Sequence, residues 1–275
     1  LGKKYSAYCL DPIPLQFGFL PHAEKIKSDK TAFDFSSFDL IITLDCGSIG
    51  RTKLTEEIKK RNSGQFLIEI DHHIKVENGA DLELRSPAFS STTEAVYEFF
   101  KANKIKINKN MANCILAGIL TDSGNFIYQA TSDKTIKISS EMLSRGANLT
   151  QITESTLRNK NFGALKIWGK AISRMEVNEK YEIAFTALRL EDIEGADEED
   201  LEGIPNFLGN LGNAKAIMVI REQKDGTVKG SLRSAHPDIN VAALAQKLGG
   251  GGHVKASGFT VEGKLERTEK GWKIV

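Results

Sequence analysis

Two strand-like runs that each end in an acid constrain the fold of this chain more than any other feature. Phe38–Leu44 is almost continuously apolar and is followed at once by Asp45, and Phe66–Ile70 ends in Asp71-His72-His73. A helical pattern over 54–60 lies between them, and strand–helix–strand alternation favours a doubly wound, mostly parallel α/β sheet. We expect parallel strands covered on both faces. Their polar ends should then meet at the carboxyl edge of the sheet, where ligands and catalytic groups gather.

The second half of the chain has a different pattern and predicts a smaller α+β domain. Lys224-Asp225-Gly226-Thr227 separates two β-rich runs, which is a strong hairpin signal. Thr150 to about Val177 is helical in period and reads partly as a link between the domains. The predicted organisation is therefore an α/β domain over 1–155, a helical connector over 156–178 and an α+β domain over 179–275.

Composition narrows the choice of partners. The formal net charge of +1 gives no support for a generally basic nucleic-acid binder, so polyanion recognition must be local and long duplexes are not expected. No apolar run approaches the ~18 residues of a membrane helix. Cys9, Cys46 and Cys114 are odd in number and widely spaced, which favours reduced, buried thiols and a cytoplasmic protein.

Three acid-bearing segments carry the candidate chemistry. Asp45 and Asp71-His72-His73 end strands, and Asp122 follows an apolar helix and precedes a Ser-Gly turn. Converging carboxylates and imidazoles suit a divalent cation such as Mn²⁺, and two such ions can activate a water and clamp a phosphoryl group. Each segment alone also fits a helix cap, a turn or a structural histidine pair. Only their joint placement favours a metal site.

The glycine run near the C-terminus predicts phosphate recognition. Glycine allows backbone N–H groups to approach a phosphate closely, and an arginine on a strand can bind phosphate through two hydrogen bonds. The alternative for the run alone is a flexible loop that ends a helix. The predicted substrate-binding residues are Asn206, Arg233, Gly250, Gly251, Gly252, His253 and Lys255.

At this point the sequence resembles a known family. Leu44–Gly47, Asp71–His73 and Gly118–Phe126 resemble the second, third and fourth motifs of the DHH phosphoesterases. Ser231–Ser234 together with Gly249–Phe259 resembles the signature of the DHH-associated C-terminal domain. The resemblance covers nearly the whole chain and keeps the motif order. Its nearest branch is the oligoribonucleases that also dephosphorylate 3′-phosphoadenosine 5′-phosphate.

The resemblance implies roles for individual residues. Asp45 would bridge two Mn²⁺ ions, with His72 and Asp122 as further metal ligands. Asp71 would orient an imidazole, and His73 would contact the phosphate or protonate the leaving oxygen. The implied substrates are short single-stranded RNA, cleaved to mononucleotides by an exonuclease activity, and nucleoside bisphosphates. A homodimer is among the candidate assemblies.

One family motif is not found in the chain as given. Leu1-Gly2-Lys3-Lys4 reads as the end of a helix, so we expect the first strand and its His/Asp cluster to be absent and the metal shell to be incomplete. Two alternatives therefore stay open: a RecJ-type single-strand exonuclease, and a nucleotide-binding module without catalysis. A RecJ-type enzyme would have an additional oligonucleotide-binding barrel, for which the chain has no obvious room. An inorganic pyrophosphatase is disfavoured, because that branch has a different C-terminal domain.

Overall fold

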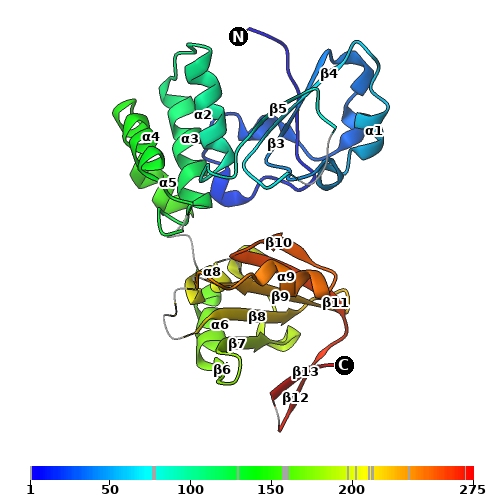
Figure 1. The fold of residues 1–275 in the computed structure, drawn as a ribbon, viewed down its shortest axis with the longest axis vertical. Helices are drawn as coiled ribbons and strands as arrows, with labels where there is room; N and C mark the ends of the chain where they lie inside the picture. Colours follow the sequence, from blue (N-terminus) through cyan, green and yellow to red (C-terminus); the bar gives the residue numbers. More distant parts are fainter. Residues whose placement is uncertain are drawn as a thin grey trace. The chain divides into compact units, whose positions relative to one another are not determined.

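The computed structural model describes residues 2–75, 79–128, 130–156, 161–196, 198–201, 203–209, 211, 214–234, 236–269 and 271–275. The chain divides into two compact units, Leu1–Asn159 and Lys160–Val275 (Figure 1). None of the described helices is both long enough and apolar enough to cross a membrane.

The first unit is built on a parallel sheet, as predicted for an α/β fold. Its strand order is β3-β4-β5, and the bounds are Leu40–Leu44, Phe66–Asp71 and Leu82–Arg85. The connection from β3 to β4 contains α1 (Thr55–Lys59), whose Ile58 packs on Leu67 of β4 in a small core. A separate two-stranded parallel sheet joins β1 (Ala7–Tyr8) and β2 (Ile26–Lys27).

β3 is less covered than the sequence predicted. Leu40, Ile42 and Leu44 are 45%, 48% and 52% exposed, whereas Thr43 on the other face is buried. Among the described residues β3 pairs only with β4, so it forms one edge of the sheet. The prediction that both its faces are covered is therefore wrong. The expectation of buried thiols is also wrong for Cys9, which is exposed.

Four helices complete the first unit and lie close to one another (Figure 1). Their bounds are α2 Thr92–Ala102, α3 Lys109–Asp122, α4 Asp133–Ser144 and α5 Leu149–Thr156. Leu116, Ile119, Met142 and Ile152 are almost fully buried between them. Ser91 caps α2, since its hydroxyl accepts a hydrogen bond from the N–H of Glu94.

The second unit contains a six-stranded mixed sheet in the order β10-β11-β9-β8-β7-β6. Neighbouring strands are antiparallel except for the parallel pair β7–β8. The strand bounds are β6 Glu176–Asn178, β7 Ile183–Leu188, β8 Ala216–Glu222, β9 Thr227–Arg233, β10 Gly251–His253 and β11 Ala256–Glu262. β8 and β9 form the predicted hairpin, and Gly226 in its turn has a φ of 83°. A small hairpin of β12 (Leu265–Thr268) and β13 (Gly271–Ile274) follows.

Helices cover this sheet on both faces. α9 (Val241–Lys247) packs on the face formed by Val228, Leu232 and Phe259. The helices of the other face are α6 Phe162–Ser173, α7 Glu198–Leu201 and α8 Ile204–Leu208. The segment predicted as a connector, 156–178, thus contains α6 and β6, and Ile167 and Ala171 of α6 belong to the core of the second unit. Residues 157–160 of that segment lie outside the described part.

Short 3₁₀ turns connect several of these elements. Their bounds are Leu15–Phe17, Ala23–Lys25, Lys30–Ala32, Phe35–Ser37, Ile49–Thr52 and Leu190–Asp192.

Candidate active site

Asp71 is the buried centre of the Asp-His-His segment. Its side chain is 0% exposed, and its carboxylate accepts hydrogen bonds from the backbone N–H groups of Gly47 (2.6 Å), His72 (2.7 Å) and His73 (2.8 Å). Burial by itself would raise the pKa of Asp71, but the hydrogen bonds from His73 and Gly47 outweigh it and hold the pKa well below its usual range. Asp71 therefore stays ionised and ties the end of β4 to the turn that follows β3.

The two histidines of the segment have different partners. His73 Nδ1 lies 2.7 Å from the Asp71 carboxylate, and this hydrogen bond raises the pKa of His73 although burial opposes it. His72 Nδ1 lies 3.3 Å from the carbonyl oxygen of Phe89. Because a carbonyl only accepts, Nδ1 of His72 carries the proton in this contact, and Nε2 presents its lone pair on the other side of the ring.

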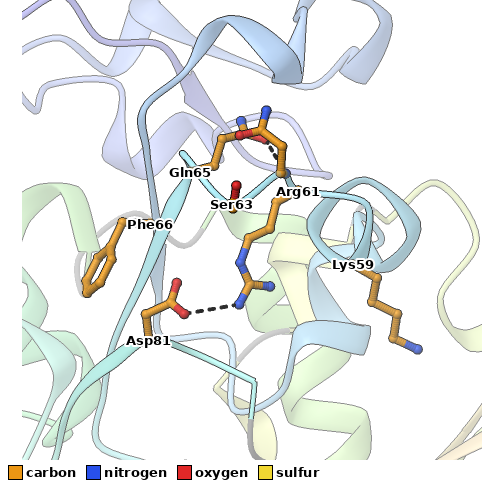
Figure 2. Close-up of a pocket in the computed structure, with 7 residues that line it drawn as sticks. Lys59, Arg61, Ser63, Gln65, Phe66 and Asp81 are labelled. Atoms are coloured by element: carbon orange, nitrogen blue, oxygen red, sulfur yellow. Dashed lines mark hydrogen bonds and ion pairs between the residues drawn. The ribbon is translucent and has the colours of Figure 1, made fainter.

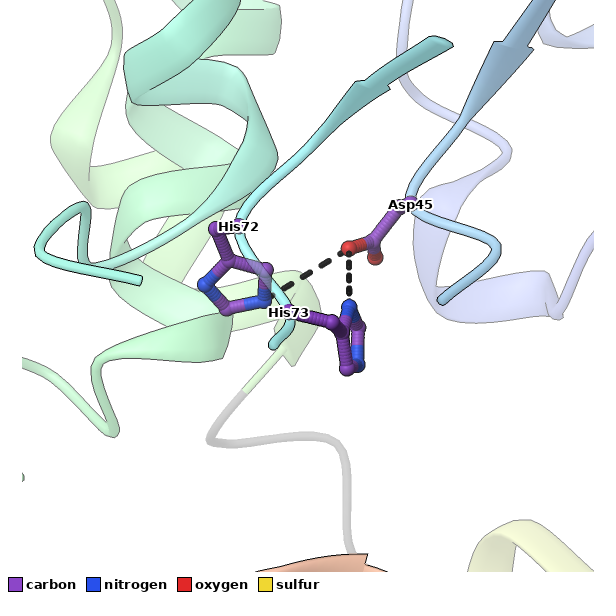
Figure 3. A group of neighbouring side chains, drawn as sticks. All are labelled: Asp45, His72 and His73. Carbon is purple, nitrogen blue, oxygen red and sulfur yellow. Dashed lines mark ion pairs between the residues drawn. The ribbon is translucent and has the colours of Figure 1, made fainter. Parts of the chain in front are cut away.

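Two further acids meet that Nε2 atom. His72 Nε2 lies 3.5 Å from Asp45 Oδ1 and 3.2 Å from Asp122 Oδ2, and His73 Nδ1 lies 3.6 Å from the same Asp45 oxygen. Figure 3 shows both imidazoles pointing toward the Asp45 carboxylate. The convergence of Asp45, Asp71-His72-His73 and Asp122 that the sequence suggested is thus present in the first unit.

The backbone explains why Asp45 and Asp122 reach this place. Asp45 has a φ of 58°, which turns the chain sharply after β3, and its side chain accepts a 2.7 Å hydrogen bond from the hydroxyl of Thr92 at the start of α2. Asp122 is the last residue of α3, which approaches α2 closely at Gly118. A Cβ at position 118 would lie 2.3 Å from Cγ2 of Thr93. Burial raises the pKa of the Asp122 carboxyl, and His72 offsets this only in part.

The donor atoms fit a divalent cation. Asp45, His72 and His73 each offer a ligand atom within 4.8 Å of the others. Ligands on one cation at bond lengths of about 2.1 Å lie roughly 3 Å apart, close to the separations of His72 Nε2 from Asp45 and Asp122. A metal-bound histidine usually donates its other ring N–H to a carbonyl or carboxylate, as His72 does to Phe89. His73 Nδ1 is instead engaged by Asp71.

Arg85 forms a buried ion pair beside Asp71 that was not predicted from the sequence. Arg85 at the end of β5 lies 2.6 Å from Glu69 and 3.5 Å from Asp71, and its side chain is 6% exposed. It also donates a 3.0 Å hydrogen bond to the carbonyl of His73. The available signal was Glu69 itself: a charged residue within an apolar strand that is buried on both faces needs a partner.

Two of the predicted substrate-binding residues meet in the second unit. Arg233 Nε donates a 2.6 Å hydrogen bond to the side-chain oxygen of Asn206, which α8 carries. Both residues line a cavity of about 310 Å³ over β8 and β9, together with Ser231. Arg221 and Lys229 line the same cavity.

In the glycine run 249–252, packing or a positive φ requires glycine at three positions and not at the fourth. A Cβ on Gly250 would lie 2.1 Å from the carbonyl oxygen of Gly258, and Gly252 has a φ of 137° with β11 against it. Gly249 has a φ of 75°. A Cβ on Gly251 would meet no described atom within 4 Å, and its φ is not in the left-handed region, so packing does not explain its missing side chain.

The basic residues after the run also differ. Lys255 was grouped with the substrate-binding residues, but its ammonium donates to the backbone carbonyls of His236, Pro237 and Ile239. Since an ammonium has three donors, the structure gives Lys255 a role in closing the loop before α9. His253 is exposed on β10.

A larger cavity, of about 400 Å³, lies at the opposite edge of the first unit's sheet, beside Phe66 at the start of β4 (Figure 2). Its Arg61 lies 3.6 Å from Asp81 and donates to the carbonyls of Ile58 and Gly79. These contacts fasten the chain around the strand starts. The cavity contains none of the converging acids and histidines, so we place the chemistry at the carboxyl edge.

Residues 4–119 match the DHH family, N-terminal domain, and residues 182–271 match the DHHA1 domain. A crystal structure of an exopolyphosphatase-related protein from Bacteroides fragilis superposes with a TM-score of 0.85 at 26% identity, covering 92% of this chain and 77% of that one.

Curated relatives carry one recurring description. The bifunctional oligoribonuclease and PAP phosphatase NrnA of Thermus thermophilus is 28% identical over 198 residues, or 72% of this chain and 59% of that protein. A probable protein of the same description from Streptococcus mutans is 30% identical over 71% of this chain and 63% of its own length. The chain thus spans about three fifths of the length of these relatives.

Proposed function

Because residues 4–119 are a DHH family N-terminal domain and residues 182–271 a DHHA1 domain, we propose that this chain is a metal-dependent phosphoesterase. It hydrolyses short RNA oligonucleotides to mononucleotides. It also removes the 3′-phosphate from 3′-phosphoadenosine 5′-phosphate. The observation that carries the proposal is the meeting of Asp45 and Asp122 at Nε2 of His72. The relatives described as oligoribonuclease and PAP phosphatase support the choice of substrates.

Asp45, His72 and Asp122 hold the metal in this proposal. Mn²⁺ suits the mixed carboxylate and imidazole donors. When bound, a divalent cation of this kind lowers the pKa of a water and offsets charge on the phosphoryl oxygens. Thr92 fixes the carboxylate of Asp45 by its 2.7 Å hydrogen bond, and the carbonyl of Phe89 fixes the ring of His72.

His73 and Asp71 act on the leaving group. Asp71 is ionised and accepts a 2.7 Å hydrogen bond from Nδ1–H of His73, which fixes the ring and raises the pKa of His73. The imidazolium form that this favours carries a second proton on Nε2, which is the proton to be transferred. The leaving oxygen of a nucleotide ester is a poor leaving group unless a proton reaches it, and a positioned imidazole supplies one. The DHHA1 domain recognises the nucleotide, through Arg233, Asn206 and the backbone at Gly251.

The test is product analysis by chromatography. The chain is incubated with di- to pentaribonucleotides and, separately, with 3′-phosphoadenosine 5′-phosphate, with Mn²⁺ or with EDTA. Mononucleotide and phosphate should appear only with the metal, and Asp45→Ala should release neither. Absence of both products with Mn²⁺, Mg²⁺ and Co²⁺ would refute the proposal. If the chain then binds the nucleotides without turning them over, the non-catalytic module is favoured. If the chain is active but releases mononucleotides faster from long single strands than from di- to pentaribonucleotides, the RecJ-type activity is favoured.

A further inference from the structure

A fully buried glutamate lies beside the site and has no part in the chemistry described so far. Glu94, in the first turn of α2, is 0% exposed. A Ser-x-x-Glu spacing at a helix start usually forms a capping box, in which the glutamate accepts a hydrogen bond from the N–H of the capping residue. Ser91 caps α2, but the Glu94 carboxylate accepts instead from the N–H of Ser90, one residue earlier. The acid is therefore directed at the segment before the helix.

Ser90 gives both of its hydrogen-bond donors to the same oxygen of Glu94. The backbone N–H and the hydroxyl of Ser90 each lie 2.9 Å from Oε2 of Glu94, and Ser90 is 1% exposed. Thr135, in the first turn of α4, donates a third hydrogen bond of 3.2 Å to that oxygen. Breaking these bonds would leave buried polar groups unpaired. The carboxylate of Glu94 therefore fixes the backbone at Ser90.

The segment 89–92, which we call the entry segment of α2, contacts two of the proposed metal ligands. The carbonyl oxygen of Phe89 lies 3.3 Å from Nδ1 of His72. The hydroxyl of Thr92 donates a 2.7 Å hydrogen bond to Oδ1 of Asp45. The serine held by the buried glutamate lies between these two contacts. One short segment thus orients an imidazole ligand and a carboxylate ligand together.

We propose that Glu94 is a positioning residue for the metal site and acts through the entry segment. This inference rests on the proposed function, because it takes Asp45 and His72 as metal ligands. Groups that orient a metal ligand typically change metal affinity by about 10–100-fold when they are removed. Glu94 fixes two such groups through one oxygen. The affinity for Mn²⁺ should therefore depend on that oxygen, although Glu94 acts only through other residues.

Binding of Mn²⁺ separates positioning from simple stabilisation of the fold. Calorimetric titration of the metal-free chain, at a temperature at which every variant is folded, compares the wild type with Glu94→Met, Glu94→Gln and Thr135→Val. Glu94→Met removes the oxygen and should raise the Kd for Mn²⁺ about tenfold. Glu94→Gln keeps an acceptor oxygen for Ser90, so its Kd should stay within about threefold of the wild-type value.

Thr135→Val is the matched control for stability. Thr135 is 0% exposed and binds the same oxygen of Glu94, yet it belongs to α4 and not to the entry segment. Thr135→Val should unfold at a lower temperature because it loses a buried hydrogen bond, with a Kd for Mn²⁺ within about threefold of the wild-type value. Hydrogen–deuterium exchange in EDTA should be faster across 89–92 in Glu94→Met than in Thr135→Val.

Two results would overturn the inference while the proposed function stands, since the wild-type chain binds Mn²⁺ in both. In one, Glu94→Met is folded and binds Mn²⁺ as tightly as the wild type. In the other, Glu94→Met and Thr135→Val weaken binding equally, as a general loss of stability would. If Glu94→Met does not fold, Glu94→Asp takes its place with the same expected weakening, because the shorter side chain withdraws the oxygen from Ser90. A wild-type chain that binds no Mn²⁺ would refute the proposed function and this inference with it.

Discussion

The two candidate regions use opposite means to prepare for a ligand. At the carboxyl edge of β3 and β4, charged groups are fixed by other buried groups: Asp71 is held by three backbone N–H groups and by Arg85. On the sheet of the second unit, side chains are absent or small where Gly251, Gly258 and Ser231 lie side by side. Atoms that must be placed to a fraction of an ångström are held by a buried network, whereas recognition of a flexible substrate needs room between cations.

Substituting a proposed metal ligand should lower turnover more than any other change. A smaller loss would contradict the assignment of the chemistry to the first region. Asp45→Ala or His72→Ala should lower kcat by more than the roughly 10²–10³-fold that one hydrogen-bond donor to a transition state supplies. Mononucleotide release from a dinucleotide measures this. Asp39→Ala, at the exposed start of the same strand segment, should keep full activity. Wild-type turnover in His72→Ala would show that the chemistry lies elsewhere.

Arg85→Met tests whether the first region depends on its buried charges. It leaves Glu69 and Asp71 without their cation and should cost about 3–5 kcal/mol of unfolding free energy. Urea unfolding followed by circular dichroism measures the loss. Trp168 and Trp272, the two tryptophans, are both in the second unit, so the tryptophan fluorescence transition should stay in place.

The neighbouring Lys75–Glu83 pair provides the control for Arg85. It is close, at 2.6 Å, but Lys75 is 44% exposed. Lys75→Met should therefore cost no more than about 1 kcal/mol. Equal losses for Arg85→Met and Lys75→Met would mean that burial of the pair adds nothing.

A buried acid outside both regions tests whether a buried ion pair stabilises the fold where no functional site is involved. Asp192 is held by Arg174 and by the N–H of Arg189, which lower its pKa against the effect of burial. Its contribution is complete above the ordinary pKa of 3.8 and is lost as the pH falls toward the lowered value. Asp192→Asn should cost about 1.5–3 kcal/mol at pH 7 and progressively less below pH 4.

Tryptophan fluorescence in urea at several pH values measures this dependence. Asp238→Asn, whose side chain is 86% exposed, is the matched control and should leave the pH dependence unchanged. A difference between wild type and Asp192→Asn that stays constant down to pH 3 would contradict the prediction.

In the second region, two neighbouring glycines should respond differently to substitution: one is required by packing, and the other is proposed to contact the substrate. Gly250→Ala should destabilise the second unit by about 1–3 kcal/mol, because its Cβ would overlap the carbonyl of Gly258. Gly251→Ala should change stability by no more than about 0.5 kcal/mol, yet raise KM. Urea unfolding and steady-state kinetics measure the two effects. An unchanged KM for Gly251→Ala would mean that the sheet surface at Gly251 does not contact the substrate.

Arg233→Ala should have the smallest effect on the reaction and sharpens the division between the regions. Removing a cation that binds ground state and transition state alike should raise KM about tenfold and leave kcat within about threefold. Steady-state kinetics on a dinucleotide decide this. If instead kcat collapses at unchanged KM, Arg233 belongs with the reacting groups.

Much of the fold and the central residues could be predicted from local sequence. A short apolar run ending in an acid already implies a strand with a polar group at the carboxyl edge, so Asp45 and Asp71-His72-His73 could be proposed as candidate residues without a structure. The hairpin at Asp225-Gly226 was equally local, since the turn chemistry lies in adjacent residues. The segment 150–177 was harder, because helical period does not reveal which core a helix joins.

What only the tertiary structure decided depends on contacts between distant residues. The pairing of Arg85 with Glu69, the capture of Lys255 by three carbonyls and the partners of each glycine arise from strand register and loop packing. Arg221 and Lys229 face one another because the hairpin register opposes them. The sequence by itself determined which groups end each strand, because side-chain direction follows the local backbone. Which groups meet was set by packing, because that depends on how separate elements fit together.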